Sequence, residues 1–441
     1  MSNRPRLGIL VSGGPAPGIN AVIGAATIEA CNRGFEVVGF YDGFQWLSSD
    51  AFDPEQHALK LTIPRVSRIH FDGGSILRIS RANLLDRESL KGGPVRPDAA
   101  RVERVVKNLG RLGVANLLTI GGDDTALSAR FLNDSGQVRV VHVPKTIDND
   151  LPLPHDMPTF GFSTARYIGT DLVKNLMADA ATTNRWYVVT AMGRSAGWLA
   201  LYIGLAAGAT VTLIPEEFGE RTSVGHIVDI IEGAVLKRRV MNRQDGVVIM
   251  AEGLAYRLGD RVELERLLGT SVSVDAAGHP RLADVPLGDL IKRELTARFK
   301  QRGDAIGVIT HELGYELRSA DPSPFDMSYC RSLGYHSIRL FMRPERPKGC
   351  EMVTLVNGAL SPVNLNDAAD PATNRTRVRL VDVRSDYYRV ARAYMIRLDR
   401  SDLENADQLA KLAAEARMTP EEFVKRFEAS APRLVDGVPA G

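Results

Sequence analysis

The chain has 441 residues, of which 44% are hydrophobic and 24% are charged, so it can form one large domain or two ordinary domains around a substantial core. Its 55 lysines and arginines nearly balance its 53 aspartates and glutamates, and the net charge of +2 gives no reason to expect a nucleic-acid partner. The three cysteines are not closely spaced, which argues against a disulfide framework or a zinc site.

The N-terminal segment and the hydropathy of the chain indicate a cytoplasmic protein. The chain begins with a short basic tail that leads directly into a strand-like run, without the apolar core of a signal peptide. No apolar run reaches the ~18 residues of a membrane-spanning helix, so no membrane partner is expected. Without signs of disulfides, a reducing compartment is the expected setting.

Apolar, strand-like runs alternate with amphipathic, helix-like runs along the chain. The expected elements of the first half are a strand over 6–14, a helix over 20–34, a strand over 35–43, a helix over 98–113 and strands over 115–124 and 138–146. Further strands are expected over 185–193, 209–217, 245–253 and 305–314. Nearly continuous valine and isoleucine runs followed by helical segments indicate parallel strands that are covered on both faces.

This pattern predicts an α/β fold of two doubly wound, mostly parallel sheet domains that face each other across an active-site cleft. The boundary between the two sheet-forming halves is expected near residue 155. Residues 254–283 interrupt the alternation and are expected to form an insertion. Residues 345–441 are expected to be a C-terminal extension that packs on the core, with a strand-like piece over 351–358 and a helix over 403–417.

Polar and glycine-rich clusters follow most of the expected strands. They are SGGPAPG at 12–18, GGDDT at 121–125, PKTIDND at 144–150, MGR at 192–194, PEE at 215–217, AEG at 251–253 and GYELR at 314–318. Ligands of doubly wound sheets bind beyond the carboxyl ends of the strands, so these clusters predict a single shared site.

The cluster at 12–18 is able to bind an anion. Backbone N–H groups at a helix N-terminus are exposed to a ligand, and glycine lets an anion approach them closely. Taken alone, the stretch is read equally well as an ordinary strand-to-helix turn. It is not the GxxxxGK[ST] motif of nucleotide-binding loops, and no GxGxxG follows a strand, so a dinucleotide fold is disfavoured.

The clusters at 121–125 and 144–150 combine acids with one lysine. A carboxylate of the first could hold a metal ion that bridges to phosphate. An aspartate of the second can accept the proton of an alcohol that attacks phosphorus, and Lys145 can neutralise charge on the transferred group. DND alone is typical of a capped, charged turn, but its occurrence one strand after GGDD favours catalysis.

The later clusters contain groups that suit a sugar phosphate. Arg194 lies on a glycine-flanked turn, and arginine recognises phosphate through two hydrogen bonds. Glu252 could accept hydrogen bonds from sugar hydroxyls or could be an ordinary acid at a helix start. Tyr315 and Arg318 are three residues apart and could reach one phosphate. The combined set predicts phosphoryl transfer from a phosphoanhydride to the hydroxyl of a sugar phosphate.

Over roughly residues 6–345, the motifs and their order resemble the phosphofructokinase family. The motifs that carry the resemblance are SGGPAPGIN at 12–20, YDGF at 41–44, GGSIL at 73–77, SR at 80–81, GGDD, PKTIDND, MGR, AEG and GYELR. TIDND and MGR together are highly specific. The resemblance implies that residues 1–155, completed by part of 320–350, bind the phosphoryl donor, and that residues 156–320 bind the sugar phosphate.

The resemblance also implies roles for individual positions. On the donor side, it implies diphosphate contacts from Gly14, Arg81 and Gly122, a cofactor Mg²⁺ held by Asp123, and catalytic contributions from Asp124 and Lys145. On the acceptor side, it implies that Asp148 deprotonates the C1 hydroxyl and that Arg194 assists catalysis. The implied contacts of fructose 6-phosphate are Thr146, Ile147, Asp148, Met192, Gly193, Arg194 and Glu252, with Tyr315 and Arg318 on the 6-phosphate.

One further position implies an assembly. Arg185 matches an arginine that in this family often reaches into the site of a neighbouring subunit. A homodimer or homotetramer is therefore expected.

Two positions distinguish the possible donors. Members that use ATP have glycine where this chain has Asp124 and Lys145. Glycine at the first position leaves room for the α-phosphate of a nucleotide, whereas Asp124 fills that space with volume and like charge. Lys145 can neutralise a smaller donor, and we expect Asp124 to pair with it. Arg78 and Ile79 also replace the usual glycine and threonine near the nucleoside pocket.

The expected reaction is reversible transfer of a phosphoryl group from diphosphate to fructose 6-phosphate, giving fructose 1,6-bisphosphate and phosphate in glycolysis or gluconeogenesis. One alternative is an ATP-dependent 6-phosphofructokinase. A second is a pyrophosphate-dependent kinase that acts on another ketose phosphate, such as sedoheptulose 7-phosphate. A third is a non-catalytic subunit that senses sugar phosphates, which would not need Asp123, Asp148 or Arg194.

Overall fold

The computed structural model describes residues 4–154, 157–258, 262, 265–266, 269, 271, 285–435 and 438–439. The chain forms two compact units, of which unit 1 comprises Met1–Ala165 and Tyr315–Arg379, and unit 2 comprises Arg166–Gly314 and Leu380–Gly441. The expected C-terminal extension is thus divided between the units after Arg379. Most of the expected insertion over 254–283 lies outside the described residues.

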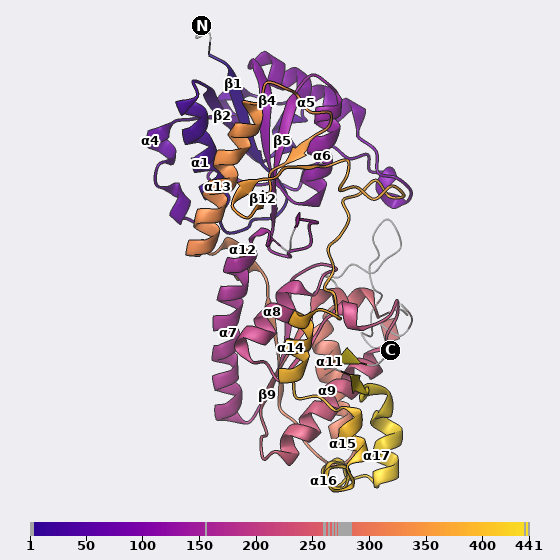
Figure 1. Cartoon of the computed structure of the whole chain (residues 1–441). Coiled ribbons are helices and arrows are strands. Elements are labelled where there is room, and N and C mark those ends of the chain that lie inside the picture. Colours follow the sequence, from indigo (N-terminus) through magenta and orange to yellow (C-terminus); the bar gives the residue numbers. More distant parts are fainter. Residues whose placement is uncertain are drawn as a thin grey trace. The chain divides into compact units, whose positions relative to one another are not determined.

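Unit 1 contains a sheet with the strand order β14–β11–β5–β4–β1–β2–β3 (Figure 1). Its strands are β1 (Arg6–Val11), β2 (Glu36–Phe40), β3 (Ala58–Leu61), β4 (Val114–Gly121), β5 (Arg139–Thr146), β11 (Glu351–Met352) and β14 (Val363–Asn364), and β6 (Phe160–Gly161) pairs with β5 off this path. The strands from β11 to β2 pair in parallel, whereas β3 and β14 are antiparallel to their neighbours. The prediction of a mostly parallel sheet is confirmed.

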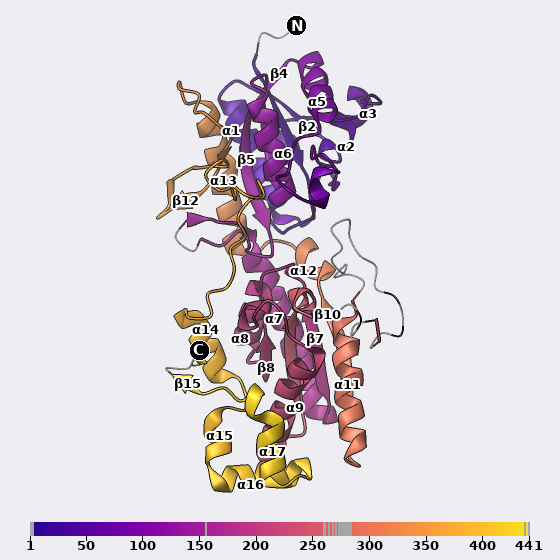
Figure 2. The same cartoon turned by 90° about the vertical axis from the view of Figure 1, so that its right-hand side faces the viewer.

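The helices of unit 1 are α1 (Ile19–Asn32), α2 (Phe44–Leu47), α3 (Pro54–His57), α4 (Ile63–Val66), α5 (Ala99–Arg111), α6 (Asp123–Asp134), α12 (Tyr315–Ser319) and α13 (Pro324–Phe341), and the short strands β12 (Leu355–Val356) and β13 (Ala359–Leu360) pair with each other. Helices α1 and α13 lie on one face of the sheet, and α5 and α6 lie on the other (Figure 2). Helix α13 packs closely on α1, because Gly334 lacks a Cβ that would otherwise lie 2.5 Å from the carbonyl oxygen of Val22. A late part of the chain therefore completes the core of unit 1.

Unit 2 contains a parallel sheet with the order β10–β7–β9–β8. Its strands are β7 (Trp186–Ala191), β8 (Val211–Leu213), β9 (Gly246–Ala251) and β10 (Val308–Leu313). Its helices include α7 (Phe162–Thr183), which begins at the end of unit 1, α8 (Trp198–Ala207), α9 (Val224–Val240), α11 (Leu287–Gln301) and α14 (Asp386–Tyr394). Central residues such as Val188 and Val248 are fully buried, as expected for strands covered on both faces.

The last part of unit 2 differs from the single helix predicted over 403–417. The structure has α15 (Arg400–Glu404), α16 (Ala406–Ala416) and α17 (Pro420–Phe427), followed by the paired strands β15 (Leu434–Val435) and β16 (Val438–Pro439). The helix is interrupted at Asn405, whose backbone is extended and whose side chain accepts a hydrogen bond from the Gln408 N–H at 3.0 Å. Asparagine competes with helical hydrogen bonding in this way and is a favoured N-cap.

The helices of the described part of the chain are all too short or too polar to cross a membrane.

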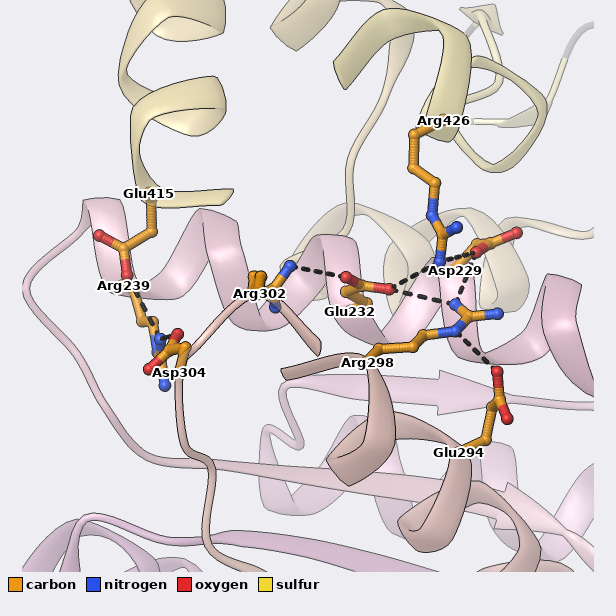
Figure 3. A network of polar contacts seen from close by, with 9 residues as sticks. All are labelled: Asp229, Glu232, Arg239, Glu294, Arg298, Arg302, Asp304, Glu415 and Arg426. Atoms are coloured by element: carbon orange, nitrogen blue, oxygen red, sulfur yellow. Dashed lines mark hydrogen bonds and ion pairs between the residues drawn. The ribbon is translucent and has the colours of Figure 1, made fainter. Parts of the chain in front are cut away.

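A network of charged side chains joins α9, α11 and α17 in unit 2 (Figure 3). Its centre is Glu232, whose side chain is 2% exposed and lies 3.1 Å from Arg298, 2.8 Å from Arg302 and 3.3 Å from Arg426. Asp229 lies one turn earlier on α9 and contacts Arg298 at 2.7 Å. The network fixes the C-terminal helices on α9 by charge pairing, in addition to the apolar contacts around Phe423 and Phe427.

Glu232→Ala should destabilise unit 2 by about 3–5 kcal/mol, because it leaves three arginines without their shared carboxylate. Glu294→Ala is the matched control, since Glu294 is 34% exposed and contacts only Arg298, at 3.0 Å, within this network. We expect the control to cost less than about 1 kcal/mol. Chemical denaturation of the three proteins measures the difference, and equal losses in both variants would contradict the central role of Glu232.

Candidate active site

The carboxyl ends of β1, β4 and β5 meet at one edge of the unit 1 sheet. The loop after β1 is fixed there, because Ser12 N–H donates to the Ile120 carbonyl at 3.0 Å and Gly13 N–H donates to the Ser80 carbonyl at 2.9 Å. The Ser12 hydroxyl also donates to the Ser80 and Ala82 carbonyls at 2.9 and 3.0 Å. These bonds bring the segment that contains Arg81 beside the loop that contains Gly14. Arg81 itself is exposed.

Gly13 allows three of the predicted clusters to approach one another. Its φ of +94° lies in the left-handed region that side chains rarely adopt. A Cβ at this position would lie 3.7 Å from Lys145 Nζ and 3.9 Å from Gly122 N. The glycine-rich loop, the start of α6 and the end of β5 are therefore immediate neighbours.

The two acids of GGDD form the first turn of α6. Gly122 is the N-cap residue and has no side chain to cap the helix, while Asp123 and Asp124 are the first two helical residues. Asp123 is half-buried and Asp124 is exposed. The partial positive charge of a helix N-terminus favours acidic side chains, so the first turn of α6 suits both aspartates.

Lys145 is the buried cation of this edge, with 3% of its surface exposed. Its ammonium group donates to the Gly14 carbonyl oxygen. Burial lowers the pKa of Lys145 to about 8, with Asp148 and Asp150 acting in the opposite direction and Arg318 adding to the decrease. The lysine is thus a weakly solvated cation that a phosphate group can pair with.

The expected pairing of Asp124 with Lys145 is not present. Among the described residues, no ion pair within 4.0 Å joins the two side chains, and the carboxylates that act on Lys145 are Asp148 and Asp150. The physical reason is the position of Asp124 on the first turn of α6, where it is exposed, whereas Lys145 is buried behind the Gly14 carbonyl.

The segment Thr146–Asp150 forms a tight, buried loop after β5. Thr146 Oγ1 accepts a hydrogen bond from the Asp148 N–H at 3.0 Å. Ile147, Asp148 and Asp150 are only 4%, 8% and 8% exposed. Asn149 has a φ of +57°, which asparagine tolerates better than most residues. Asp148 is therefore held by a constrained backbone rather than by a mobile loop.

Tyr315 and Arg318 lie on α12 and belong to unit 1. The Arg318 guanidinium stacks over the Tyr315 ring at 4.5 Å, and its Nη1 lies 3.4 Å from where a Cβ on Gly14 would be. Arg318 thus lies beside Gly14 and acts electrostatically on Lys145. Tyr315 is 73% exposed.

In unit 2, Glu252 organises the MGR turn. One of its carboxylate oxygens accepts the N–H groups of Gly193 at 3.1 Å and Arg194 at 2.6 Å. Arg194 has a φ of +54° and is exposed, while Met192 N–H donates to the Leu313 carbonyl at 2.9 Å. The sequence suggested sugar hydroxyls as partners of Glu252, but the structure shows that one of its oxygens holds the turn that presents Arg194.

Arg185 lies at the opposite end of β7 from these residues. It immediately precedes the strand, whereas Met192 immediately follows it. Seven residues of extended chain span roughly 23 Å, so the structure does not bring Arg185 to the MGR turn of unit 2.

Two residues that were not among the predicted site residues support these loops. Glu216 Oε1 accepts the N–H groups of Gly197 at 2.9 Å and Val381 at 3.0 Å, and Gly197 is the N-cap of α8, directly after the MGR turn. Arg379 binds the backbone that follows Asp148. Arg379 lies in the C-terminal extension, far from any motif, so no local pattern identified it.

Asp123 fits a magnesium ion. Among the described residues, no three His, Cys, Asp or Glu side chains gather into a metal-binding group. Mg²⁺ is commonly bound through one or two carboxylates together with substrate phosphates and water, so a single carboxylate is an adequate protein contribution.

Parallel strands with a glycine-rich loop, a carboxylate and a buried lysine at their carboxyl ends are typical of a phosphoryl-transfer site. The chain belongs to the phosphofructokinase family, since the model of that family matches residues 6–341.

Two relatives that match nearly the whole chain have more specific names. The chain is 50% identical over 424 residues to the pyrophosphate–fructose 6-phosphate 1-phosphotransferase of Thermotoga maritima, covering 96% of this chain and 98% of the relative. It is 44% identical over 436 residues to the enzyme of the same name from Naegleria fowleri, covering 97% and 96%. The crystal structure of the pyrophosphate-dependent phosphofructokinase from Marinobacter aquaeolei has a TM-score of 0.62 at 16% identity, covering 99% of this chain and 95% of that chain, which supports the fold.

Proposed function

We infer that this chain is a pyrophosphate-dependent 6-phosphofructokinase, which transfers a phosphoryl group from diphosphate to the C1 hydroxyl of fructose 6-phosphate. The observation that carries this inference is the buried Lys145, which binds the Gly14 carbonyl beside Gly122 and the start of α6. A buried ammonium group at a glycine-rich edge suits a compact, highly charged donor. The relatives from Thermotoga maritima and Naegleria fowleri are named for the same donor and acceptor, which supports this inference.

The donor side of the reaction uses groups of unit 1. Backbone N–H groups near Gly14 and Gly122 bind diphosphate oxygens, and Arg81 adds a positive charge. Lys145 pairs with the phosphoryl group as it is transferred. Asp123 would hold Mg²⁺, which would neutralise part of the diphosphate charge.

The acceptor side begins with Asp148. Its carboxylate accepts the proton of the C1 hydroxyl while that oxygen forms a bond to phosphorus. The bond between this phosphorus and the bridging oxygen breaks, and orthophosphate leaves with the electron pair. Arg194 stabilises negative charge on the transferred group, and Glu252 holds the turn that presents Arg194. Thr146, Ile147, Met192 and Gly193 contact the sugar.

A panel of donors and acceptors tests this function. Purified protein with Mg²⁺ is assayed with diphosphate or ATP, each with fructose 6-phosphate or sedoheptulose 7-phosphate. We expect diphosphate with fructose 6-phosphate to give the highest kcat/KM, and fructose 1,6-bisphosphate with phosphate to give the reverse reaction. A preference for ATP would overturn the donor assignment, and no activity with any pair would favour a sugar-phosphate sensor.

The pKa of Lys145 predicts a pH dependence. Because burial lowers this pKa to about 8 in the free protein, the cation is lost as pH rises through that value. The kcat/KM for diphosphate should therefore fall about tenfold per pH unit above it. Lys145→Arg keeps its charge and should lack this decline, apart from the ionisation of diphosphate itself, which both proteins share. Identical alkaline profiles of the two proteins would contradict the role of the Lys145 cation.

Arg318→Ala tests which phosphate group Arg318 binds. If Arg318 binds the 6-phosphate, the KM for fructose 6-phosphate should rise about tenfold to a hundredfold, as expected for loss of a charged hydrogen bond. The KM for diphosphate should stay nearly constant. Arg339→Ala is the control, because Arg339 is an exposed arginine of α13 that contacts Tyr335 at 3.3 Å. Because Arg318 lies beside Gly14, a selective rise in the KM for diphosphate would assign it to the donor instead.

We also propose that the protein is a cytoplasmic homodimer or homotetramer in which Arg185 serves a neighbouring subunit's site. The position of Arg185 at the far end of β7 from the MGR turn supports this proposal. Analytical ultracentrifugation at assay concentrations tests it, and full activity of a monomer would exclude a shared site.

A further inference from the structure

Arg379 forms several hydrogen bonds with the backbone on the carboxyl side of Asp148. Its own N–H donates to the Asp150 carbonyl at 2.7 Å. Its guanidinium donates through Nε to the Asn149 carbonyl at 3.1 Å, through Nη1 to the Met157 carbonyl at 3.0 Å, and through Nη2 to Asn149 Oδ1. One arginine thus joins the two ends of the segment that follows Asp148.

The same segment is also fixed on its amino side. Thr159 Oγ1 donates to the Thr146 carbonyl at 2.6 Å, and Thr159 N–H donates to Asn149 Oδ1 at 3.0 Å. Asn149 Oδ1 is therefore shared between Arg379 and Thr159. This sharing holds Asn149 at its positive φ of +57°, a conformation that sets the direction of the chain directly after Asp148.

We propose that Arg379 is a positioning residue for Asp148 in phosphoryl transfer. The proposal rests on the proposed function of this chain. The family model ends at residue 341, so Arg379 lies in the extension, outside the matched region. The extension therefore contributes to turnover by fixing the backbone that carries the general base, although none of its residues needs to touch a substrate.

Arg379→Ala should lower kcat about tenfold to a hundredfold, because a displaced catalytic group loses rate steeply with small errors in position. The KM values for diphosphate and fructose 6-phosphate should change by less than about threefold, since the groups proposed to bind the phosphates are untouched. Millimolar guanidinium chloride should restore part of the lost kcat by occupying the vacated position. Arg379→Lys keeps the charge but not the fork of donors, and should have an intermediate kcat.

Arg377→Ala is the matched control. Arg377 is an exposed arginine two residues earlier, and its guanidinium binds the Asp367 carbonyl rather than the Asp148 loop. It should have the kcat of the unaltered protein. A kcat of Arg379→Ala equal to that of this control would overturn the proposal.

Hydrogen exchange separates this proposal from the proposed function. In Arg379→Ala and Arg379→Lys, exchange should increase in peptides that cover 144–161 and remain unchanged in β4. Unchanged exchange over 144–161, or an increase throughout unit 1, would overturn the positioning role. If the unaltered protein is inactive with diphosphate, the proposed function is wrong. A local increase in exchange in the Arg379 variants would still show that Arg379 holds this loop.

Discussion

Asp148→Ala is expected to lower turnover by about 10²–10⁴, the usual size of the loss when a general base is removed. Asp148 is 8% exposed on a loop fixed by the Thr146 hydroxyl, so the backbone defines the position of its carboxylate. The KM for fructose 6-phosphate should change far less, because the arginines proposed to bind phosphate are retained. Steady-state kinetics with diphosphate measures both values.

Asp148→Asn is the companion variant, since it keeps the shape and polarity of the side chain but removes its basicity. It should lose about as much turnover as the alanine variant. Unfolding curves of both variants establish that the proteins are folded. Near-normal turnover in the asparagine variant would show that Asp148 is not the base.

Asp124→Gly is expected to change the donor preference. In the unaltered protein, ATP should be a very poor donor, because its α-phosphate would meet the Asp124 carboxylate at close range. Juxtaposed like charges cost several kcal/mol, so removing this one should raise kcat/KM for ATP on the order of a hundredfold. The measurement is kcat/KM for both donors, and an unchanged preference would refute the role of Asp124 in rejecting ATP.

The structure alters one part of this expectation. Asp124 and Lys145 form no ion pair among the described residues, and Lys145 is held by the Gly14 carbonyl. Asp124→Gly should therefore leave most of the diphosphate activity in place, whereas Lys145→Gly should depress it strongly. The double variant should still be a poor ATP enzyme, since Arg78 and Ile79 occupy the positions of the usual glycine and threonine.

Asp407→Gly is the control for the helical position. Like Asp124, Asp407 is an exposed acid in the second position of a helix, here α16 in unit 2. Glycine costs about 1 kcal/mol within a helix, so both variants should lose similar stability. Only Asp124→Gly should gain activity with ATP.

Local pattern in the sequence was sufficient for the parallel α/β architecture and for the carboxyl-end clusters. Nearly continuous valine runs can be buried only in a sheet covered on both faces, and parallel strands bring their carboxyl ends to one edge. The prediction that GGDD and PKTIDND are neighbours followed from this rule, and Gly13 is found between Gly122 and Lys145. The family was likewise identified from short motifs, because each motif is a contiguous loop whose chemistry is local.

The sequence did not determine contacts that depend on segments far apart in the chain. Lys145 was expected to pair with Asp124, but its partner is the carbonyl of Gly14, more than a hundred positions earlier. Arg318 lies beside that same glycine, and Arg379 binds the loop after Asp148 from the C-terminal extension. Each of these contacts joins residues that are far apart in the chain. Arginine and lysine side chains are long, so each could reach several different polar groups. The tertiary structure determines which partner is bound, because a charged group that is removed from water needs a polar partner and the fold determines which polar groups are near it.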